Sequence, residues 1–165
     1  MPAPARLTHA DAHGRLRMVD VGDKPDSARE AVASGHVLLS AATRRAVRAG
    51  RLKKGDPLQA ARLAGIMAAK HTASIVPLCH PLPLTGIDVE LTHTARGIAI
   101  RAAVRTQGKT GVEMEALTAV AAAALTVYDM LKAIDKGMVI ERIQLDEKRG
   151  GRSGEFRRTA RPGRR

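Results

Sequence analysis

Hydrophobic residues recur at every second position along two neighbouring stretches in the middle of the chain, residues 85–94 and 97–106. Polar or charged residues fall between them, as in strands that have one buried face and one solvent-exposed face. Only Ala95 and Arg96 separate the two stretches, which therefore predict a β-hairpin. The apolar members are Ile87, Val89 and Leu91 in the first stretch and Ile98, Ile100, Ala102 and Val104 in the second.

Two longer stretches have the composition of helices. Residues 58–72 place apolar side chains on a broad helical face, and they follow Asp56, which can cap a helix, and Pro57, which can begin one. Residues 112–135 are small and apolar through most of their length, and Gly137 can end them. We expect both stretches to be helices and the second to pack closely against its neighbours.

Further strands at residues 30–40 and 138–145, together with a short helix at 41–49, complete the predicted elements. Between the first long helix and the hairpin, three prolines make residues 77–84 a rigid extended loop. Without the short helix the order is βαββαβ, the split arrangement of ferredoxin-like folds. The sequence thus predicts an α+β, ferredoxin-like fold, in which two long helices pack on one face of an antiparallel sheet.

Composition limits the class of protein. The 165 residues suffice for one domain with a substantial core, and because only 1% of them are aromatic, that core must consist of Ala, Val, Leu, Ile and Met. The single cysteine, Cys79, allows no internal disulfide, which fits a reducing cytoplasm. No signal peptide and no run of about eighteen apolar residues is visible, so we expect a cytoplasmic protein with no membrane contact.

The net charge of +12 is unevenly distributed along the chain. Residues 148–165 hold eight basic residues against one acidic residue, so much of the excess belongs to a basic, Gly- and Arg-rich C-terminal tail. We expect the polar residues 1–25 to form a mobile arm, which leaves residues 26–147 as the ferredoxin-like domain. The moderate basicity of that domain is consistent with a polyanionic ligand.

The segment GKTG (108–111) suggests nucleotide binding. However, Ala103 stands where a phosphate loop of the G-x-x-x-x-G-K-[ST] type requires glycine. The segment nevertheless joins a predicted strand to a predicted helix, where free backbone N–H groups and the helix dipole favour an anion. The alternative is a tight turn with an exposed lysine.

The charged side chains of the second long helix are confined to its two ends. Glu113 and Glu115 lie near its start, while Asp129 and Lys132 are one turn apart near its end. The latter two can form a surface ion pair or, if partly buried, a general acid–base couple. Glu115 and Asp129 are about 21 Å apart along the axis. A small ligand cannot reach both ends of one helix, so a site that uses both must be shared between two copies of the chain.

The remaining candidates lie in loops. Cys79 and His80 are adjacent, so their side chains point apart and make a poor pair of metal ligands; no metal site is predicted. Cys79 would need a base within reach to act as a nucleophile, whereas His80 could form a hydrogen bond to a ligand. Lys54 precedes the capping Asp56 and could be solvated, bind phosphate or donate a proton.

Together these segments match one family in their order along the chain. The matching strings are LTH at Leu7, MVDV at Met18, REA at Arg29, KGD at Lys54, AGI and AAK between Ala64 and Lys70, PLCHPL at Pro77, GKTGVEMEALTA at Gly108, YDM-x-KA at Tyr128 and GG-x-SG at Gly150. On these strings, residues 4–158 resemble the cyclic pyranopterin monophosphate synthase family, the second enzyme of molybdenum cofactor biosynthesis.

The resemblance implies a lyase that rearranges 3',8-cyclised dihydro-GTP to cyclic pyranopterin monophosphate. A cyclic phosphate closes and pyrophosphate leaves, without a redox step, so no electron carrier is required, and Mg²⁺ could accompany the triphosphate. The substrate would come from an upstream radical enzyme, and no nucleic-acid partner is implied. The resemblance also implies a homohexamer, a trimer of dimers with sites at the dimer interfaces, which would explain the separated helix ends.

Site residues carried over by motif fall into two groups. The resemblance implies that Asp129, Lys54 and Lys132 are catalytic. It assigns substrate contacts to Leu78, Cys79, His80, Glu113, Met114, Glu115, Lys148 and Arg152, the last two for the phosphates. The family is expected to have lysine at the position of Arg152, and arginine there exchanges a point charge for a bidentate donor.

Two other classes of function remain open from the residues alone. Ferredoxin-like topology and positive charge also suit an RNA-binding module, although such sheets stack bases on aromatic side chains and this chain has only Tyr128 and Phe156. A regulatory subunit that binds GTP without converting it is the third possibility.

Overall fold

The structure, a computed structural model, describes residues 13–50, 52, 55–152 and 154–159. Its elements follow in the order β1 (Ser27–Leu38), α1 (Ala41–Arg48), α2 (Pro57–Lys70), α3 (Thr72–Ile75), β2 (Leu84–His93), β3 (Gly97–Gly108), α4 (Glu113–Leu131), β4 (Val139–Arg149) and β5 (Phe156–Arg157).

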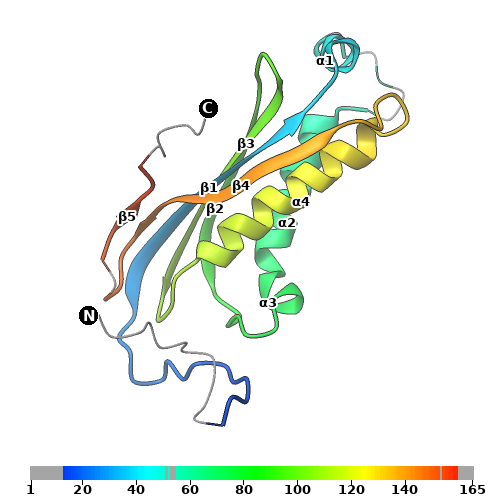
Figure 1. The fold of residues 1–165 in the computed structure, drawn as a ribbon. Coiled ribbons are helices and arrows are strands. Elements are labelled where there is room, and N and C mark those ends of the chain that lie inside the picture. The colour runs from blue at the N-terminus through cyan, green and yellow to red at the C-terminus, as the bar shows by residue number, and fades with distance from the viewer. Residues whose placement is uncertain (1–12, 51, 53–54, 153, 160–165) are drawn as a thin grey trace, which may run out of the picture.

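The strands form one antiparallel sheet in the order β2-β3-β1-β4-β5. Helices α2 and α4 lie side by side on one face of this sheet, while α1 lies beyond the end of β1 (Figure 1). The order β4-β1-β3-β2 is the one that two crossovers of the split βαβ type produce. The structure therefore confirms the predicted ferredoxin-like fold.

The core is built from small residues that let the layers approach closely. A Cβ atom on Gly65 in α2 would lie 2.9 Å from the carbonyl oxygen of Ala119, and one on Gly35 in β1 would lie 2.6 Å from Cγ1 of Val120. Although α4 is long and apolar enough to cross a membrane, it packs against α2 and the sheet as the core helix. Its fully buried residues are Ala116, Ala119, Val120, Ala123, Ala124, Val127 and Leu131.

The start of α2 is set by a local cap, whereas the end of α4 is followed by a contact with a distant part of the chain. Asp56 Oδ1 accepts hydrogen bonds from the backbone N–H groups of Leu58 at 2.8 Å and Gln59 at 3.3 Å, so the predicted cap of α2 is confirmed. Helix α4 is shorter than predicted and ends at Leu131, because the chain turns there. After the turn, the Asp135 carboxylate accepts a hydrogen bond from the Ser40 N–H at 2.9 Å, and that bond lowers the pKa of Asp135.

Strands β1 and β4 are longer than the residue pattern predicted. Strand β1 begins at Ser27 because Ser27 pairs with Gly108, and β4 continues to Arg149 because Arg149 pairs with Glu30. The short strand β5 and helix α3 were not predicted. As a result, Lys148, the first residue assigned to the C-terminal tail, lies within the sheet. The mobility of residues 1–25 stays a prediction, and residues 1–12 lie outside the described part of the chain.

Candidate active site

Two adjoining cavities lie at the start of α4. The larger, the phosphate-side cavity, has a volume of about 590 Å³, and the smaller, the ring-side cavity, has a volume of about 270 Å³. Both are lined by Lys24, Thr110, Gly111 and Glu113, so they form one continuous site. One acidic residue and five basic residues line the phosphate-side cavity, and the basic ones are Lys24, Arg29, Lys109, Lys148 and Arg152.

The GKTG turn lines both cavities of the site. The N-cap residue of α4, Val112, makes no side-chain capping bond. One backbone N–H of the first turn, that of Glu115, interacts with its own carboxylate, and the others, with the positive end of the helix dipole, can face an anion. Lys109 is half-buried rather than exposed, and its Nζ donates to the carbonyl oxygen of Gly22 at 2.5 Å. This bond joins the N-terminal segment to the turn. The lysine of the turn is therefore not simply exposed to solvent, as the alternative interpretation required.

Arg29 holds this turn in place, a role that the sequence did not indicate. Its Nε donates to the carbonyl oxygen of Gly108 at 2.8 Å, and its Nη2 donates to that of Lys109 at 3.0 Å. Arg29 was noted only as part of the REA string, because its partners lie 79 and 80 positions away in the chain. Only the pairing of β1 with β3 brings them together.

The GG-x-SG segment packs against the same place. Gly150 and Gly151 have φ angles of +87° and +80°, in the left-handed region that favours glycine. A Cβ atom at Gly150 would collide with the carbonyl oxygen of Ala28, and one at Gly151 would collide with the guanidinium group of Arg29. The glycines therefore let the β4–β5 turn close over the start of β1, and this turn carries Arg152.

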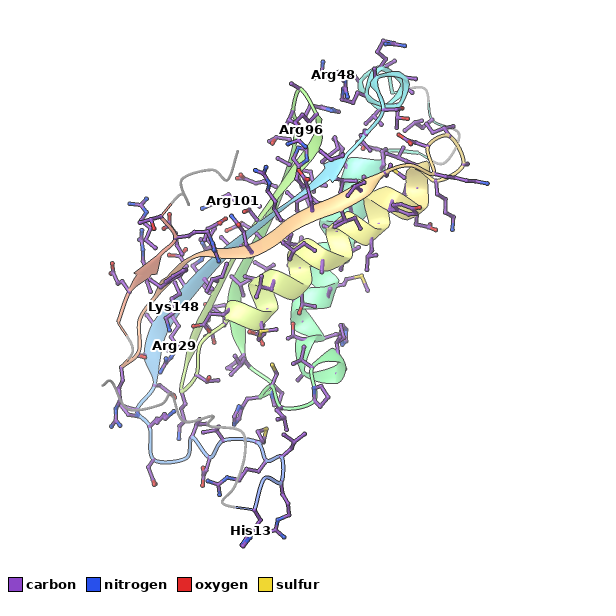
Figure 2. The ribbon with its side chains drawn as sticks, in the orientation of Figure 1. His13, Arg29, Arg48, Arg96, Arg101 and Lys148 are labelled. Atoms are coloured by element: carbon purple, nitrogen blue, oxygen red, sulfur yellow. The ribbon has the colours of Figure 1, made fainter. Side chains whose placement is uncertain are left out.

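An ion pair joins α4 to β4 across the phosphate-side cavity. Lys148 Nζ lies 3.2 Å from Glu113 Oε1, and both side chains are half-buried. Figure 2 shows Lys148 and Arg29 close together near the start of α4. An incoming phosphate group would compete with Glu113 for Lys148, which ties anion binding to the position of that carboxylate.

The ring-side cavity combines apolar walls with two carboxylates. Glu115 is only 4% exposed, and its burial, assisted by the negative charge of Glu113, raises the pKa of its carboxyl group. Burial and the nearby Glu115 also raise the pKa of the Cys79 thiol, which makes it a poor nucleophile. The predicted contacts that line this cavity are Leu78, Cys79, His80, Glu113, Met114 and Glu115.

The predicted catalytic residues lie elsewhere. Asp129 Oδ1 and Lys132 Nζ are 2.6 Å apart at the far end of α4, and both side chains are more than half exposed. The hydrogen bond and charge of Asp129 raise the pKa of Lys132, so Lys132 is a charged ammonium group. Lys54 lies outside the described residues. It shortly precedes α2, whose start lies at the same end of the molecule as the end of α4 (Figure 1).

The structure therefore brings the predicted substrate contacts together and sets Asp129 and Lys132 apart from them by the length of a helix. Comparison with known families adds the decisive observation, because residues 18–151 match the model of the MoaC family. The chain belongs to the MoaC family. The match includes each predicted site residue except Arg152.

Relatives of this MoaC-family chain carry a common name. A protein of Thermomicrobium roseum named cyclic pyranopterin monophosphate synthase is 60% identical over 156 residues, which cover 93% of this chain and 94% of its own. Proteins of the same name from Heliobacterium modesticaldum and Cereibacter sphaeroides are 58% and 56% identical, covering 91% and 93% of this chain and 96% and 98% of their own. The resemblance inferred from the motifs is confirmed.

Two further observations concern the side chains of this MoaC-family chain. Among the described residues, no three His, Cys, Asp or Glu side chains are grouped so that they could hold a metal ion. The only tyrosine, Tyr128, lies on α4, and the only phenylalanine, Phe156, lies on the edge strand β5. The central strands therefore lack the aromatic platform on which ferredoxin-like RNA-binding sheets stack bases.

Proposed function

We propose that this protein is a cyclic pyranopterin monophosphate synthase, which converts 3',8-cyclised dihydro-GTP to cyclic pyranopterin monophosphate with release of pyrophosphate. Its family membership and its relatives' shared name support the reaction. The observation that carries the proposal is the joined site at the start of α4, in which a cationic cavity adjoins one that bears two carboxylates.

The phosphate-side cavity fits the triphosphate of the substrate. Arg29, Lys148 and Arg152 converge on it from β1, β4 and the turn that follows β4, and the N-terminus of α4 faces it. Guanidinium groups and helix N-termini are effective partners for phosphate oxygens. Charge concentrated in this way would hold the leaving pyrophosphate while the nucleotide part reacts.

The ring-side cavity fits the base of the substrate. A 2-amino-pyrimidinone ring offers neighbouring N–H donors along one edge, and Glu113 and Glu115 offer carboxylate acceptors. Leu78 and Met114 supply apolar contact for the ring faces, and His80 can bond to a polar group at the rim. We therefore assign the substrate contacts to these residues.

The reaction requires proton transfers and closure of a cyclic phosphate. A hydroxyl of the substrate attacks the α-phosphorus, the bond from that phosphorus to the bridging oxygen of the β-phosphate breaks, and the proton of the hydroxyl passes to a base. We assign the proton transfers to Asp129, Lys132 and Lys54. The charged Lys132 suits a proton donor or phosphate partner, and Asp129 beside it suits a base.

A single protomer cannot apply both ends of α4 to one substrate, so we propose that sites form between protomers of a homohexamer, a trimer of dimers. Apolar side chains on the outer sides of the helices support association: Leu63 and Met67 on α2 and Leu125 on α4 are each more than half exposed. Light scattering should give the mass of six chains, whereas a fully active monomer would contradict the shared site.

The proposed function also has consequences for the cellular compartment and for the cofactors of the reaction. We place the protein in the cytoplasm, where its relatives' biosynthetic role and the lone thiol of Cys79 fit a reducing environment. The reaction needs no electron carrier. If Mg²⁺ takes part, we expect it to enter with the triphosphate, since magnesium usually binds through substrate phosphates and one or two carboxylates.

Mass spectrometry of the products tests the function directly. Incubation with 3',8-cyclised dihydro-GTP should yield cyclic pyranopterin monophosphate and one equivalent of pyrophosphate. Asp129→Asn and Lys132→Ala should each lower kcat by about 100-fold or more, the contribution of a positioned acid or base. Their melting temperatures should not change, because both side chains lie on the surface. Full activity in both variants would refute the proton-transfer assignments, and tight GTP binding without conversion of the cyclised nucleotide would refute the function.

A further inference from the structure

Residues 156–158, near the C-terminus, bind to β4 through contacts that the proposed reaction does not explain. Strand β5 pairs with β4 through Phe156 opposite Lys148 and Arg157 opposite Glu147. The next residue, Arg158, makes two bonds to β4: its backbone N–H donates to the carbonyl oxygen of Asp146 at 2.7 Å, and its side-chain Nε donates to that of Leu145, also at 2.7 Å.

These bonds fall on a β-bulge. Strand β4 pairs with β1 through Leu145 and Glu147, which oppose the consecutive residues Ala33 and Val32, so Asp146 is the extra residue and has no partner in β1. A bulge leaves the extra residue outside the regular ladder and bends its strand, which redirects the side chains that follow. Arg158 thus binds the carbonyl oxygens at the point where β4 changes direction.

The part of β4 beyond the bulge carries the phosphate contacts. Lys148 lies two residues past Asp146, on the wall of the phosphate-side cavity, and Arg152 follows in the turn. Before Arg152, the turn is held by the packing of Gly150 and Gly151 on β1. After Arg152, the chain is held by the pairing of β5 with β4 and by the bonds of Arg158.

We propose that Arg158 is a positioning residue, which sets the direction of β4 at its bulge and so directs Lys148 and Arg152 at the pyrophosphate portion of the substrate. This inference rests on the proposed function. Arg158 itself lies outside the cavity, and its guanidinium group lies 5.9 Å from the centre of the Phe156 ring. The basic end of the chain therefore acts through hydrogen-bond geometry rather than through charge alone.

The chain offers matched variants that separate geometry from charge. Arg158→Met removes both the charge and the Nε–H donor. Arg158→Gln removes the charge but keeps an N–H donor at the same number of bonds from the backbone. Arg157→Gln removes the same charge from the neighbouring residue, whose side chain makes an exposed ion pair with Glu147 at 3.3 Å.

Binding of inorganic pyrophosphate, measured by titration calorimetry at fixed ionic strength, tests the proposal. We expect Arg158→Met to weaken binding about three- to tenfold, the equivalent of one hydrogen bond, and the two glutamine variants to stay within about twofold of the parent. In turnover, Arg158→Met should raise KM by a similar factor and leave kcat unchanged, because the proton-transfer groups lie elsewhere.

These experiments distinguish failure of the positioning role from failure of the proposed function. Equal weakening in Arg158→Met and Arg157→Gln would show a simple charge effect and overturn the positioning role, as would a lower melting temperature for Arg158→Met with unchanged pyrophosphate affinity. If the parent protein neither binds pyrophosphate nor converts the cyclised nucleotide, the proposed function fails and this inference fails with it. If the parent does both and Arg158→Met matches it, only the inference fails.

Discussion

Glu115 and Asp129 lie at opposite ends of α4, about 21 Å apart along its axis. Glu115 lines the ring-side cavity, whereas Asp129 pairs with Lys132 at the far end. The helix between them is rigid and buried in the core. Two residues held in this way can act on one small substrate only if they come from different protomers.

At substrate concentrations below the KM of Lys148→Met, mixed oligomers should therefore recover activity from two impaired variants, one that lacks a proton-transfer group and one that binds substrate weakly. Co-expression of Asp129→Asn with Lys148→Met should restore about a quarter of the sites, because half of the randomly formed dimers are mixed and one of their two sites keeps both native residues. Turnover of the co-purified protein measures this recovery. The control is the same two variants purified separately and assayed together without exchange. Activity no greater than that control would place the whole site within one protomer.

Burial of Glu115 should make stability depend on pH. Its pKa is raised in the folded state, so the acid form is favoured there, and the cost of burying the carboxylate grows as the pH rises from the ordinary carboxyl pKa to the folded pKa and is complete above it. Glu115→Gln should therefore raise the melting temperature at pH 8, by about 2–4 °C for each 1 kcal/mol removed.

The gain in Glu115→Gln should vanish as the pH falls below the ordinary carboxyl range, where Glu115 is protonated in both the folded and the unfolded chain. Thermal unfolding from about pH 3 to pH 8 measures this dependence. A gain that is constant across the range would mean that the substitution acts through packing rather than through the titration of Glu115.

Lys148 should contribute to substrate affinity far more than its neighbour. Lys148→Met removes a half-buried cation from the phosphate-side cavity and should raise KM about ten- to hundredfold, the effect of a lost charge-assisted hydrogen bond. Arg149→Met removes the same charge from the next position, where the side chain is exposed and pairs with Glu147 at 3.5 Å. Steady-state kinetics should show at most a twofold change there, and similar effects in both variants would point to general electrostatic attraction.

The glycines of the β4–β5 turn should differ in their tolerance of a side chain. Gly150→Ala adds a Cβ that collides with the Ala28 carbonyl oxygen, in addition to the cost of about 1–2 kcal/mol for a left-handed residue. Gly154→Ala has a similar φ, +67°, but its Cβ would meet no described atom within 4 Å. Chemical denaturation and pyrophosphate titration should therefore show a larger loss for Gly150→Ala, and equal losses would mean that the close packing on β1 has no role.

Local patterns were enough to predict the order of the elements other than α3 and β5. The alternation in residues 85–94 and 97–106 and the capping of α2 by Asp56 depend on neighbours in the chain, so they are visible without the fold. The ends of β1 and β4 and the existence of β5 depend on pairing with strands far away, and they were misplaced or missed. The end of α4 was also misplaced, and the residues that follow it contact a distant segment, through the bond between Asp135 and Ser40.

The sequence by itself determined the fold class, the family and the residue types for the chemistry, because motifs such as PLCHPL and GKTGVEMEALTA are contiguous and carry their meaning without a structure. Only the tertiary structure decided which of those residues share a cavity and which support them. Arg29 bonds to a turn about eighty residues away, and Arg158 binds a bulge that exists only where β4 meets β1. Strand register is a non-local property, and it places side chains from β1, β4 and α4 around one cationic cavity.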